Sequence, residues 1–431
     1  MRTGLRALNV LSGSALLDRV GLRDQVENAL YRVSRDGMKA AATAGRTFSD
    51  IQKIGRPARQ KTRSGKGLFD LTPDSEQQMM QEVMSQFATE QLRPAAQDAD
   101  ASCTAPAEIL EQSVELGTPM LGVPEELGGI IEERSATTTC LVAESLAHGD
   151  LGLAVAALAP SAVATAIGIW GDTDQQGRYL PSFAGEDVPA AALALHEARP
   201  LFDPLEPGAT ATREGDGYVL SGVKALVPRA RDAELFIVSA NLQDTGPALF
   251  IVESRLDGIT VADDPAMGVR AAGTGKVEFS DVKLEVGALL GGGDPEVIRD
   301  CVLRSRLAWC ALAVGCAQAV LDEVKPYVTE RKAFGEPIGH RQAVAFTVSN
   351  IAIELEGMRL TTYRAASLAD QGKPFAFEVA MAHRLCTAKG MQIGSDGVQL
   401  YGGHGYTKEY PLERWYRDLR AIGSVEGGVL A

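Results

Sequence analysis

The C-terminal third of the chain carries apolar residues at helical spacing. Between Ser305 and Val324 the residues are apolar almost without interruption, as in a helix that is buried on all sides. Two further stripes recur every three, four or seven residues: Val344, Val348, Ile351, Leu355 and Met358, and then Val379, Cys386 and Ile393. Residues at these spacings share one face of a helix. The pattern after Asp294 therefore predicts long helices packed against one another.

Between about residues 190 and 290 the pattern changes to short apolar runs that are separated by turn residues. Runs of this length, rich in branched and aromatic residues, are typical of strands. The predicted strands are Ala191–Leu195, Tyr218–Leu220, Leu235–Ala240, Ala248–Val252, Ile259–Val261 and Lys276–Phe279. Asp216-Gly217 is a typical hairpin sequence. We expect a small antiparallel β domain in this part of the chain.

From Thr72 to about Pro189 the pattern is helical again, and Thr72-Pro73-Asp74-Ser75 is a typical helix start. At 431 residues the chain is long enough for two or three domains with separate cores. The prediction is an α+β protein with a basic N-terminal extension (1–70), an N-terminal helical domain (71–189), a middle β domain (190–292) and a C-terminal helical domain (293–431).

The N-terminal extension differs in charge from the rest of the chain. Residues 1–66 contain 14 Lys and Arg against 5 Asp and Glu, a net charge of +9. Since the whole chain has a formal charge of −14, the remainder carries −23. Such an arm is a candidate for docking on the acidic body, on a partner or on an anionic membrane surface. It lacks the interleaved aromatic residues that would favour nucleic acid.

The six cysteines show no Cys-x-x-Cys spacing, and most lie in apolar helical sequence. We expect reduced, structural thiols in a cytoplasmic protein, peripheral at a membrane if the arm binds one, and no metal site. Arg2, Arg6, Asp18 and Arg19 interrupt any signal-peptide pattern, and Arg304 and Arg306 interrupt the nearest candidate for a membrane span.

Two segments of the C-terminal domain carry candidate chemistry. Residues 399–406 (Gln-Leu-Tyr-Gly-Gly-His-Gly-Tyr) place paired glycines after a helical pattern, and Glu426 stands directly before Gly427 and Gly428. Glycines allow close approach of the backbone to another group. Taken alone, such a pair is more often an ordinary helix end and turn.

Together with Arg331-Lys332-Ala333-Phe334-Gly335, Ile338 and Gln342, these segments resemble the acyl-CoA dehydrogenase family. Residues 331–342 match the family's Arg-x-x-Phe-Gly-x-x-Ile-x-x-x-Gln segment, and residues 121–129 resemble its Gly-x-Pro-Glu-x-x-Gly-Gly turn. The family's motifs usually begin near Leu71, so the resemblance does not cover the arm. It implies a helical domain, a β domain and a C-terminal four-helix bundle.

The resemblance also implies a chemistry and a set of site residues. Glu426 matches the catalytic base that removes a proton from an acyl-CoA, and Arg306 would lie beside it. In some relatives the glutamate precedes this arginine, where this chain has Ser305. The residues implied to bind FAD, partly that of a neighbouring subunit, are Arg331, Phe334, Gln342, Gln399, Gly402, Gly403 and Gly428. The implied partners are an acyl-CoA substrate, an electron-transfer flavoprotein and further subunits in a homodimer or tetramer, with a related second chain as an alternative.

Three segments depart from the family pattern at the flavin ring. The family's Gly-Ser pair on the β domain is Leu201-Phe202, its Trp-x-Thr segment is Leu226-Val227-Pro228, and its Glu-Gly-Thr turn is Glu426-Gly427-Gly428. Two hypotheses follow. The first is an FAD-dependent acyl-CoA dehydrogenase. The alternative is a non-redox companion subunit or acyl-thioester-binding protein derived from such an enzyme. As isolated residues, Glu426 would be a tail carboxylate, Arg306 a bundle ion pair and Arg331 a surface charge.

Overall fold

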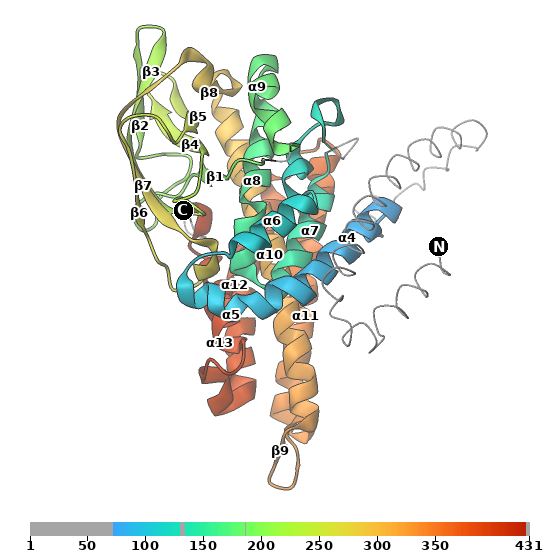
Figure 1. Cartoon of the computed structure of the whole chain (residues 1–431). Coiled ribbons are helices and arrows are strands. Elements are labelled where there is room, and N and C mark those ends of the chain that lie inside the picture. Colours follow the sequence, from blue (N-terminus) through green and yellow to red (C-terminus); the bar gives the residue numbers. More distant parts are fainter. Residues whose placement is uncertain (1–71, 130–133, 186, 428–431) are drawn as a thin grey trace, which may run out of the picture. The chain divides into compact units, whose positions relative to one another are not determined.

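Helices, a sheet and helices again follow one another along the part of the chain that the structure describes (Figure 1). The structure is a computed structural model and describes residues 72–129, 134–185 and 187–427. All of these belong to one compact unit, residues 69–431. The basic N-terminal extension predicted for residues 1–70 and the predicted cofactor residue Gly428 lie outside the described residues.

The first group of elements is helical. Its α-helices are α4 (Ser75–Phe87), α5 (Arg93–Ser102), α6 (Ala107–Glu115), α7 (Ala136–Gly149), α8 (Leu151–Trp170) and α9 (Thr173–Phe183). Helix α4 begins after Asp74, whose carboxylate accepts the backbone N–H groups of Glu76 and Gln77 and so caps the helix. Pro73 therefore precedes the cap instead of lying in the first turn, where the sequence placed it.

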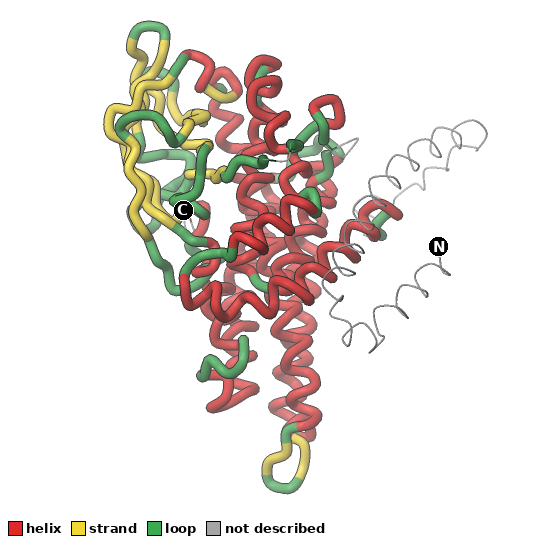
Figure 2. The backbone as a smooth tube through the Cα atoms, viewed as in Figure 1, coloured by secondary structure: helices red, strands yellow, loops and turns green. Residues whose placement is uncertain are grey.

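The middle group forms one sheet of eight described strands (Figure 2). They are β1 (Ala191–Ala194), β2 (Thr210–Glu214), β3 (Gly217–Val227), β4 (Leu235–Leu242), β5 (Gly246–Glu253), β6 (Ile259–Asp263), β7 (Gly275–Leu284) and β8 (Leu289–Leu290). The spatial order is β6-β7-β3-β2-β4-β5-β8, with β1 beside β4. The sheet is mainly antiparallel, as predicted, but β4 pairs in parallel with β1 and with β2.

The predicted hairpin joins β2 and β3, with its turn one residue earlier than expected. Glu214 pairs with Gly217, so Gly215 and Asp216 form the turn. Gly215 has a φ of +60°, a conformation that glycine adopts without steric cost.

The last group is the predicted bundle of four helices, α10 (Pro295–Glu330), α11 (Gln342–Asp370), α12 (Ala376–Tyr401) and α13 (Leu412–Ala421). A short hairpin of β9 (Lys332–Ala333) and β10 (Glu336–Pro337) connects α10 to α11. Most of the predicted stripe positions lie in the core, since Ile351, Leu355 and Met358 on α11 and Val379, Cys386 and Ile393 on α12 are all buried. Val344 and Val348, in the first two turns of α11, are partly buried and pack against that core. This part of the prediction is confirmed.

Two of the helices, α8 and α10, are long and apolar enough to cross a membrane by length and composition alone. No apolar run of spanning length was predicted from the sequence, and α8 is such a run. In their most apolar windows, 78% of α8 and 72% of α10 is buried inside the protein. Both helices therefore pack as core helices in this structure.

A buried polar cluster joins the three groups of elements. Arg414 on α13 donates from Nε to Asp150 Oδ2, at the start of α8, at 3.0 Å. Asp418, one turn further along α13, accepts the backbone N–H of Val269 from the β domain at 2.6 Å. Burial raises the pKa of Asp418 to about 8. The cluster fixes α13, the helix that leads into the Glu426 turn.

Candidate active site

Glu426 lies in a tight turn against the middle of α10. The turn is the 3₁₀ helix η9 (Val425–Gly427), and Glu426 itself has the left-handed conformation, with φ 52° and ψ 39°. The Ser305 hydroxyl donates to Glu426 Oε1 at 2.8 Å. Glu426 is only 9% exposed, and its Oε2 is buried without a hydrogen-bond partner among the described residues. One carboxylate oxygen is thus held while the other is left free.

Arg306 lies beside Glu426, as the resemblance implied, but it contacts the backbone. Its Nε and a terminal nitrogen donate to the Glu426 carbonyl oxygen at 3.1 and 2.6 Å. Burial lowers the pKa of Arg306, and the charge of Glu426 opposes that shift. Arg306 therefore fixes the turn through its direct bonds and acts on the Glu426 carboxylate through space.

The β-domain loop that contains Phe202, where the sequence departs from the family pattern, packs against the Glu426 turn. Phe202 is buried and contacts the His196 ring edge-on, with centroids 4.6 Å apart. His196 Nε2 lies 3.0 Å from the carbonyl oxygen of Ser424. A Cβ built on Gly427, which has a φ of +95°, would lie 2.5 Å from the Pro204 ring. Only glycine fits at position 427, because both the backbone conformation and the neighbouring loop exclude a side chain.

Behind this loop lies a buried ion pair that sequence analysis did not identify. Lys224 on β3 is fully buried and donates from Nζ to Glu197 Oε1 at 2.5 Å and to the Ser239 hydroxyl at 2.8 Å. The Gly208 N–H also donates to this carboxylate. Burial lowers the pKa of Lys224, and Glu197 counteracts the shift. The pair anchors the loop that follows His196. The single lysine within the mainly apolar sequence of β3 is the feature that could have indicated this ion pair.

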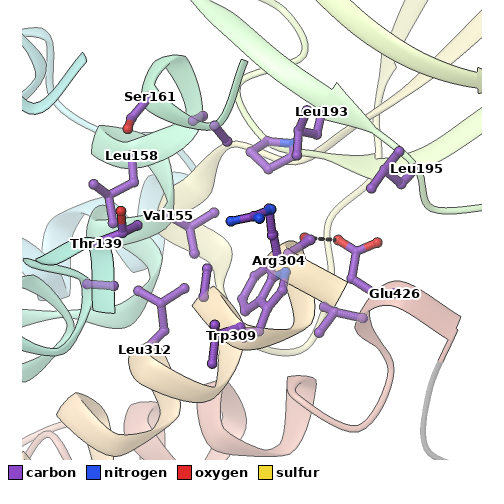
Figure 3. A pocket seen from close by; sticks show the side chains of 18 of the residues that line it. Thr139, Val155, Leu158, Ser161, Leu193, Leu195, Arg304, Trp309, Leu312 and Glu426 are labelled. Atoms are coloured by element: carbon purple, nitrogen blue, oxygen red, sulfur yellow. Dashed lines mark hydrogen bonds between the residues drawn. The ribbon is translucent and has the colours of Figure 1, made fainter. Parts of the chain in front are cut away.

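A cavity of about 740 Å³ opens in front of Glu426. Its helical walls come from α7, α8 and α10, and its β-domain wall includes Leu193, Leu195 and His196 (Figure 3). Leu226 and Pro228, which replace the family's Trp-x-Thr residues, also line it. Its volume is in the range of small-molecule and cofactor sites. The walls are mainly apolar, so a polar group that enters here meets Glu426 in surroundings with little water.

Four of the residues that the family resemblance implies for FAD line a second cavity. Arg331, Gln399, Gly402 and Gly403 surround a space of about 400 Å³ at the C-terminal end of α12. Gly402 has φ 56° and ψ −129°, a backbone region essentially restricted to glycine. A Cβ on Gly402 or on Gly403 would meet nothing within 4 Å, so the backbone is open to an approaching group.

Phe334 and Gln342 are exposed and line neither cavity. Phe334 is 95% exposed at the turn of the β9–β10 hairpin, with Arg341 over its ring at 5.6 Å. Figure 1 shows this hairpin at the end of the bundle away from the sheet. From Arg306 to Arg331 the rise of helix α10 amounts to ~37 Å. The two sets of predicted residues are therefore well separated within one chain.

The cysteine side chains lie mostly in the core. All six cysteines are free thiols, and five of them are buried. Burial raises the pKa values of Cys140 and Cys301, so these thiols stay protonated at neutral pH. Within the ranges that the structure describes, no three His, Cys, Asp or Glu side chains are grouped to hold a metal ion.

Comparison with known proteins agrees with the order of these elements. The models of the N-terminal, middle and C-terminal domains of acyl-CoA dehydrogenases match residues 74–187, 192–282 and 296–428. The short-chain specific acyl-CoA dehydrogenase of Bos taurus mitochondria is 32% identical over 357 residues, which cover 81% of this chain and 86% of that protein. The chain belongs to the acyl-CoA dehydrogenase family. Members of this family are FAD-dependent oxidoreductases that act on CH–CH bonds.

Two further relatives illustrate the range of the family. The 3-(aryl)acrylate reductase of Clostridium sporogenes is 30% identical over 358 residues, 81% of this chain and 94% of its own. The solved structure of butyryl-CoA dehydrogenase from Megasphaera elsdenii superposes with a TM-score of 0.78 at 27% identity, over 84% of this chain and 97% of that one. The predicted fold, with its helical, β and helical domains, is thereby confirmed.

Proposed function

We propose that this acyl-CoA dehydrogenase family member removes hydrogen from Cα and Cβ of an acyl-CoA thioester, with Glu426 as the base. The observation that carries the proposal is the free Oε2 of Glu426. It is buried, lacks a hydrogen-bond partner among the described residues, and belongs to a residue that lines the larger cavity. A carboxylate in this condition is poised to accept a proton from a bound molecule.

The chain's own residues hold that carboxylate in place. Ser305 donates to Oε1, and Arg306 fixes the backbone of the same residue through the carbonyl oxygen. Gly427 and the loop around Phe202 prevent the turn from moving toward the β domain. The Cα proton of the substrate passes to Glu426 Oε2, and the Glu426 carboxylate becomes a neutral carboxylic acid. The apolar cavity walls exclude water that would otherwise solvate the carboxylate.

The cavities also fit FAD. When bound, FAD would accept the hydride from the substrate's Cβ. The larger cavity has the volume and the apolar walls for a flavin ring beside Glu426. Arg331 offers a planar, charged donor for a diphosphate, and the open backbone at Gly402 and Gly403 leaves room for the rest of the dinucleotide.

The distance between the larger cavity and the Arg331 segment supports a cofactor site shared between subunits. Because Arg331 lies ~37 Å along α10 from Arg306, one chain would use its larger cavity for one FAD and its Arg331 segment for another. Phe334, exposed at the hairpin tip, would then contact the cofactor of the neighbouring subunit. We therefore expect a homodimer or tetramer, with a related second chain as the alternative. Electrons would leave through an electron-transfer flavoprotein.

One observation favours a second candidate, a companion subunit that binds an acyl thioester without redox chemistry. Phe202 stands where the family usually has the serine of a Gly-Ser pair, and it is buried in internal packing. Pro228 stands where the family has a threonine and has neither a hydroxyl nor a backbone N–H. Two contacts to the flavin ring are thus replaced by apolar groups.

Anaerobic titration of the purified full-length protein separates these candidates. We expect a bound flavin spectrum that bleaches when butyryl-CoA is added. A protein that binds butyryl-CoA by calorimetry but carries no flavin, even after incubation with FAD, would establish the companion role instead. A flavin that is bound but is not reduced by any acyl-CoA would contradict the dehydrogenase proposal.

A further inference from the structure

Two arginines, Arg134 and Arg304, line the larger cavity. Figure 3 shows the Arg304 side chain in the middle of the cavity, between Glu426 on one side and Thr139, Leu158 and Ser161 on the other. Arg134, at the start of the segment that leads into α7, lines the same space. A Cβ built on Gly168 of α8 would lie 3.0 Å from a terminal nitrogen of Arg134. This contact places Arg134 against the far part of α8.

Neither guanidinium is neutralised in full. Arg304 donates from Nε to Asp300 at 2.9 Å, and its guanidinium lies over the Phe375 ring at 5.5 Å. Its two terminal nitrogens form no hydrogen bond with a described residue. Arg134 is exposed and forms no ion pair or hydrogen bond with any residue of 72–129, 134–185 or 187–427. Loss of hydration lowers the pKa of Arg134, and the positive charge of Arg304 lowers it further. The two cations therefore repel each other across the cavity.

The other charged groups of the cavity are already engaged. Asp370 accepts hydrogen bonds from the Ser135 hydroxyl and from the backbone N–H groups of Ala136 and Thr137, so it caps α7. Arg417 is paired with Asp100 and Glu413. Arg420 donates to the Met391 sulfur. Counted over the described residues alone, the Arg134–Arg304 side of the cavity carries more positive than negative charge.

This side of the cavity also has room for the end of an acyl group. The lining residues of α8 run from Val155 to Trp170, a rise of ~22 Å along the helix. The first ones are apolar, and Ser161 and Thr165 add hydroxyl groups further along. A chain that starts at Glu426 and follows α8 passes from an apolar wall to a wall with hydroxyls and two arginines.

On the basis of the dehydrogenase function proposed above, we propose that Arg134 and Arg304 bind a carboxylate at the far end of the acyl group. The substrate class would then be ω-carboxyacyl-CoA, the thioesters of dicarboxylic acids. A carboxylate between two guanidinium groups accepts several charge-assisted hydrogen bonds and removes their mutual repulsion. A methyl-terminated acyl group would leave Arg134 and the terminal nitrogens of Arg304 without this anion, so the site would discriminate against it.

Binding constants test this assignment independently of turnover. The full-length protein with Glu426→Gln, which lacks the proposed base, is titrated calorimetrically with glutaryl-, adipyl- and suberyl-CoA and with pentanoyl-, hexanoyl- and octanoyl-CoA. For at least one chain length we expect the carboxylate form to bind about 10- to 100-fold more tightly than the methyl form. Each pair contains the same CoA phosphates, so their contribution cancels in the ratio.

Substitutions then assign the preference to the two arginines. Arg134→Gln and Arg304→Gln should each reduce the ratio to near one, and Arg134→Lys should retain part of it. Arg134→Glu should reverse the ratio and favour the methyl form. Arg178→Gln, a substitution of an exposed arginine on α9, should change nothing. Circular dichroism of each variant checks that it is folded.

Three outcomes would overturn the proposal. They are a wild-type ratio near one at every length, a ratio that survives both substitutions, and an equal weakening of both thioesters. The last would show that the arginines bind CoA phosphates. Because binding is measured without turnover, these results are distinct from a failure of flavin reduction, which concerns the dehydrogenase function itself.

Discussion

The substitution Glu426→Gln tests the base most directly, because the structure separates the two oxygens of this carboxylate. Oε1 accepts from Ser305, and a glutamine oxygen can keep that bond. The amide NH₂ then takes the place of Oε2, which has no partner among the described residues. The turn, the bond from Arg306 to the backbone carbonyl and the packing of Gly427 are left unchanged. Only the proton acceptor is lost.

The size of the effect follows from the role of a general base. Removing such a group typically slows the reaction ~10²–10⁴-fold. This corresponds to roughly 3–5 kcal/mol of transition-state stabilisation, at ~1.4 kcal/mol for each factor of ten. Substrate binding should change little, since the proposed role of Glu426 concerns only the proton at Cα. The loss is therefore expected in the rate of flavin reduction and not in the dissociation constant.

Anaerobic stopped-flow mixing with butyryl-CoA measures that rate in a single turnover. Glu285→Gln, in an exposed segment before β8, is the matched control and should reduce flavin at the wild-type rate. Ser305→Ala should have a smaller effect than Glu426→Gln, because it removes one hydrogen bond and leaves the acceptor in place. Unchanged reduction in Glu426→Gln, with flavin still bound, would remove this residue from the mechanism.

Four further results are expected. Arg331→Ala should lose FAD on gel filtration while circular dichroism stays unchanged, and a flavin-loaded monomer in light scattering would contradict the shared site. Lys224→Met should lower the free energy of urea unfolding by about 3–5 kcal/mol, because it leaves Glu197 buried without its cation, and adding Glu197→Gln should restore much of it. Burial raises the pKa of Asp418 from 3.8 in the unfolded chain to about 8 in the folded protein. The free energy of unfolding of the wild type should therefore fall as pH rises from about 4 to 8. Asp418→Asn should reduce this pH dependence, as measured by urea unfolding at pH 5 and pH 8. Removal of residues 1–67 should leave flavin binding intact, and a truncated protein that unfolds would show that the arm belongs to the core.

The fold could be predicted largely from the sequence because its core stripes are long and regular. Helices α11 and α12 place apolar residues on one face over many turns, and burial of that face is what holds the bundle together. Strand β2 was missed for the opposite reason. Its sequence, Thr-Ala-Thr-Arg-Glu, buries only Ala211, so it has no apolar alternation, although it lies between β3 and β4 in the sheet. Its place depends on backbone pairing, which leaves little trace in composition.

The site was harder to predict from the sequence, because its residues come from distant positions in the chain. Ser305 and Glu426 are separated by 121 residues, and no local pattern connects them. Resemblance to the family pointed to Glu426 and to Arg306 but not to the atom that Arg306 contacts. Phe202 was visible only as a departure from a family motif. Its packing against His196, and the contact of His196 with the carbonyl oxygen of Ser424, became evident only in three dimensions.

The contact between Ser305 and Glu426 also gives a physical reason why relatives can place the catalytic glutamate at either of two positions. The Ser305 hydroxyl lies 2.8 Å from Glu426 Oε1, so side chains from both positions reach the same point in front of the cavity. A carboxylate from either position would face the same bound acyl group. In this chain the position on α10 holds a hydroxyl donor, which supports the carboxylate instead of competing with it. The geometry of the cavity, and not the position in the chain, determines what a base can reach. The different residues of the flavin-ring loops therefore do not alter the Ser305–Glu426 contact. The chemistry of proton removal can therefore persist while the contacts that orient the ring are rebuilt from apolar residues.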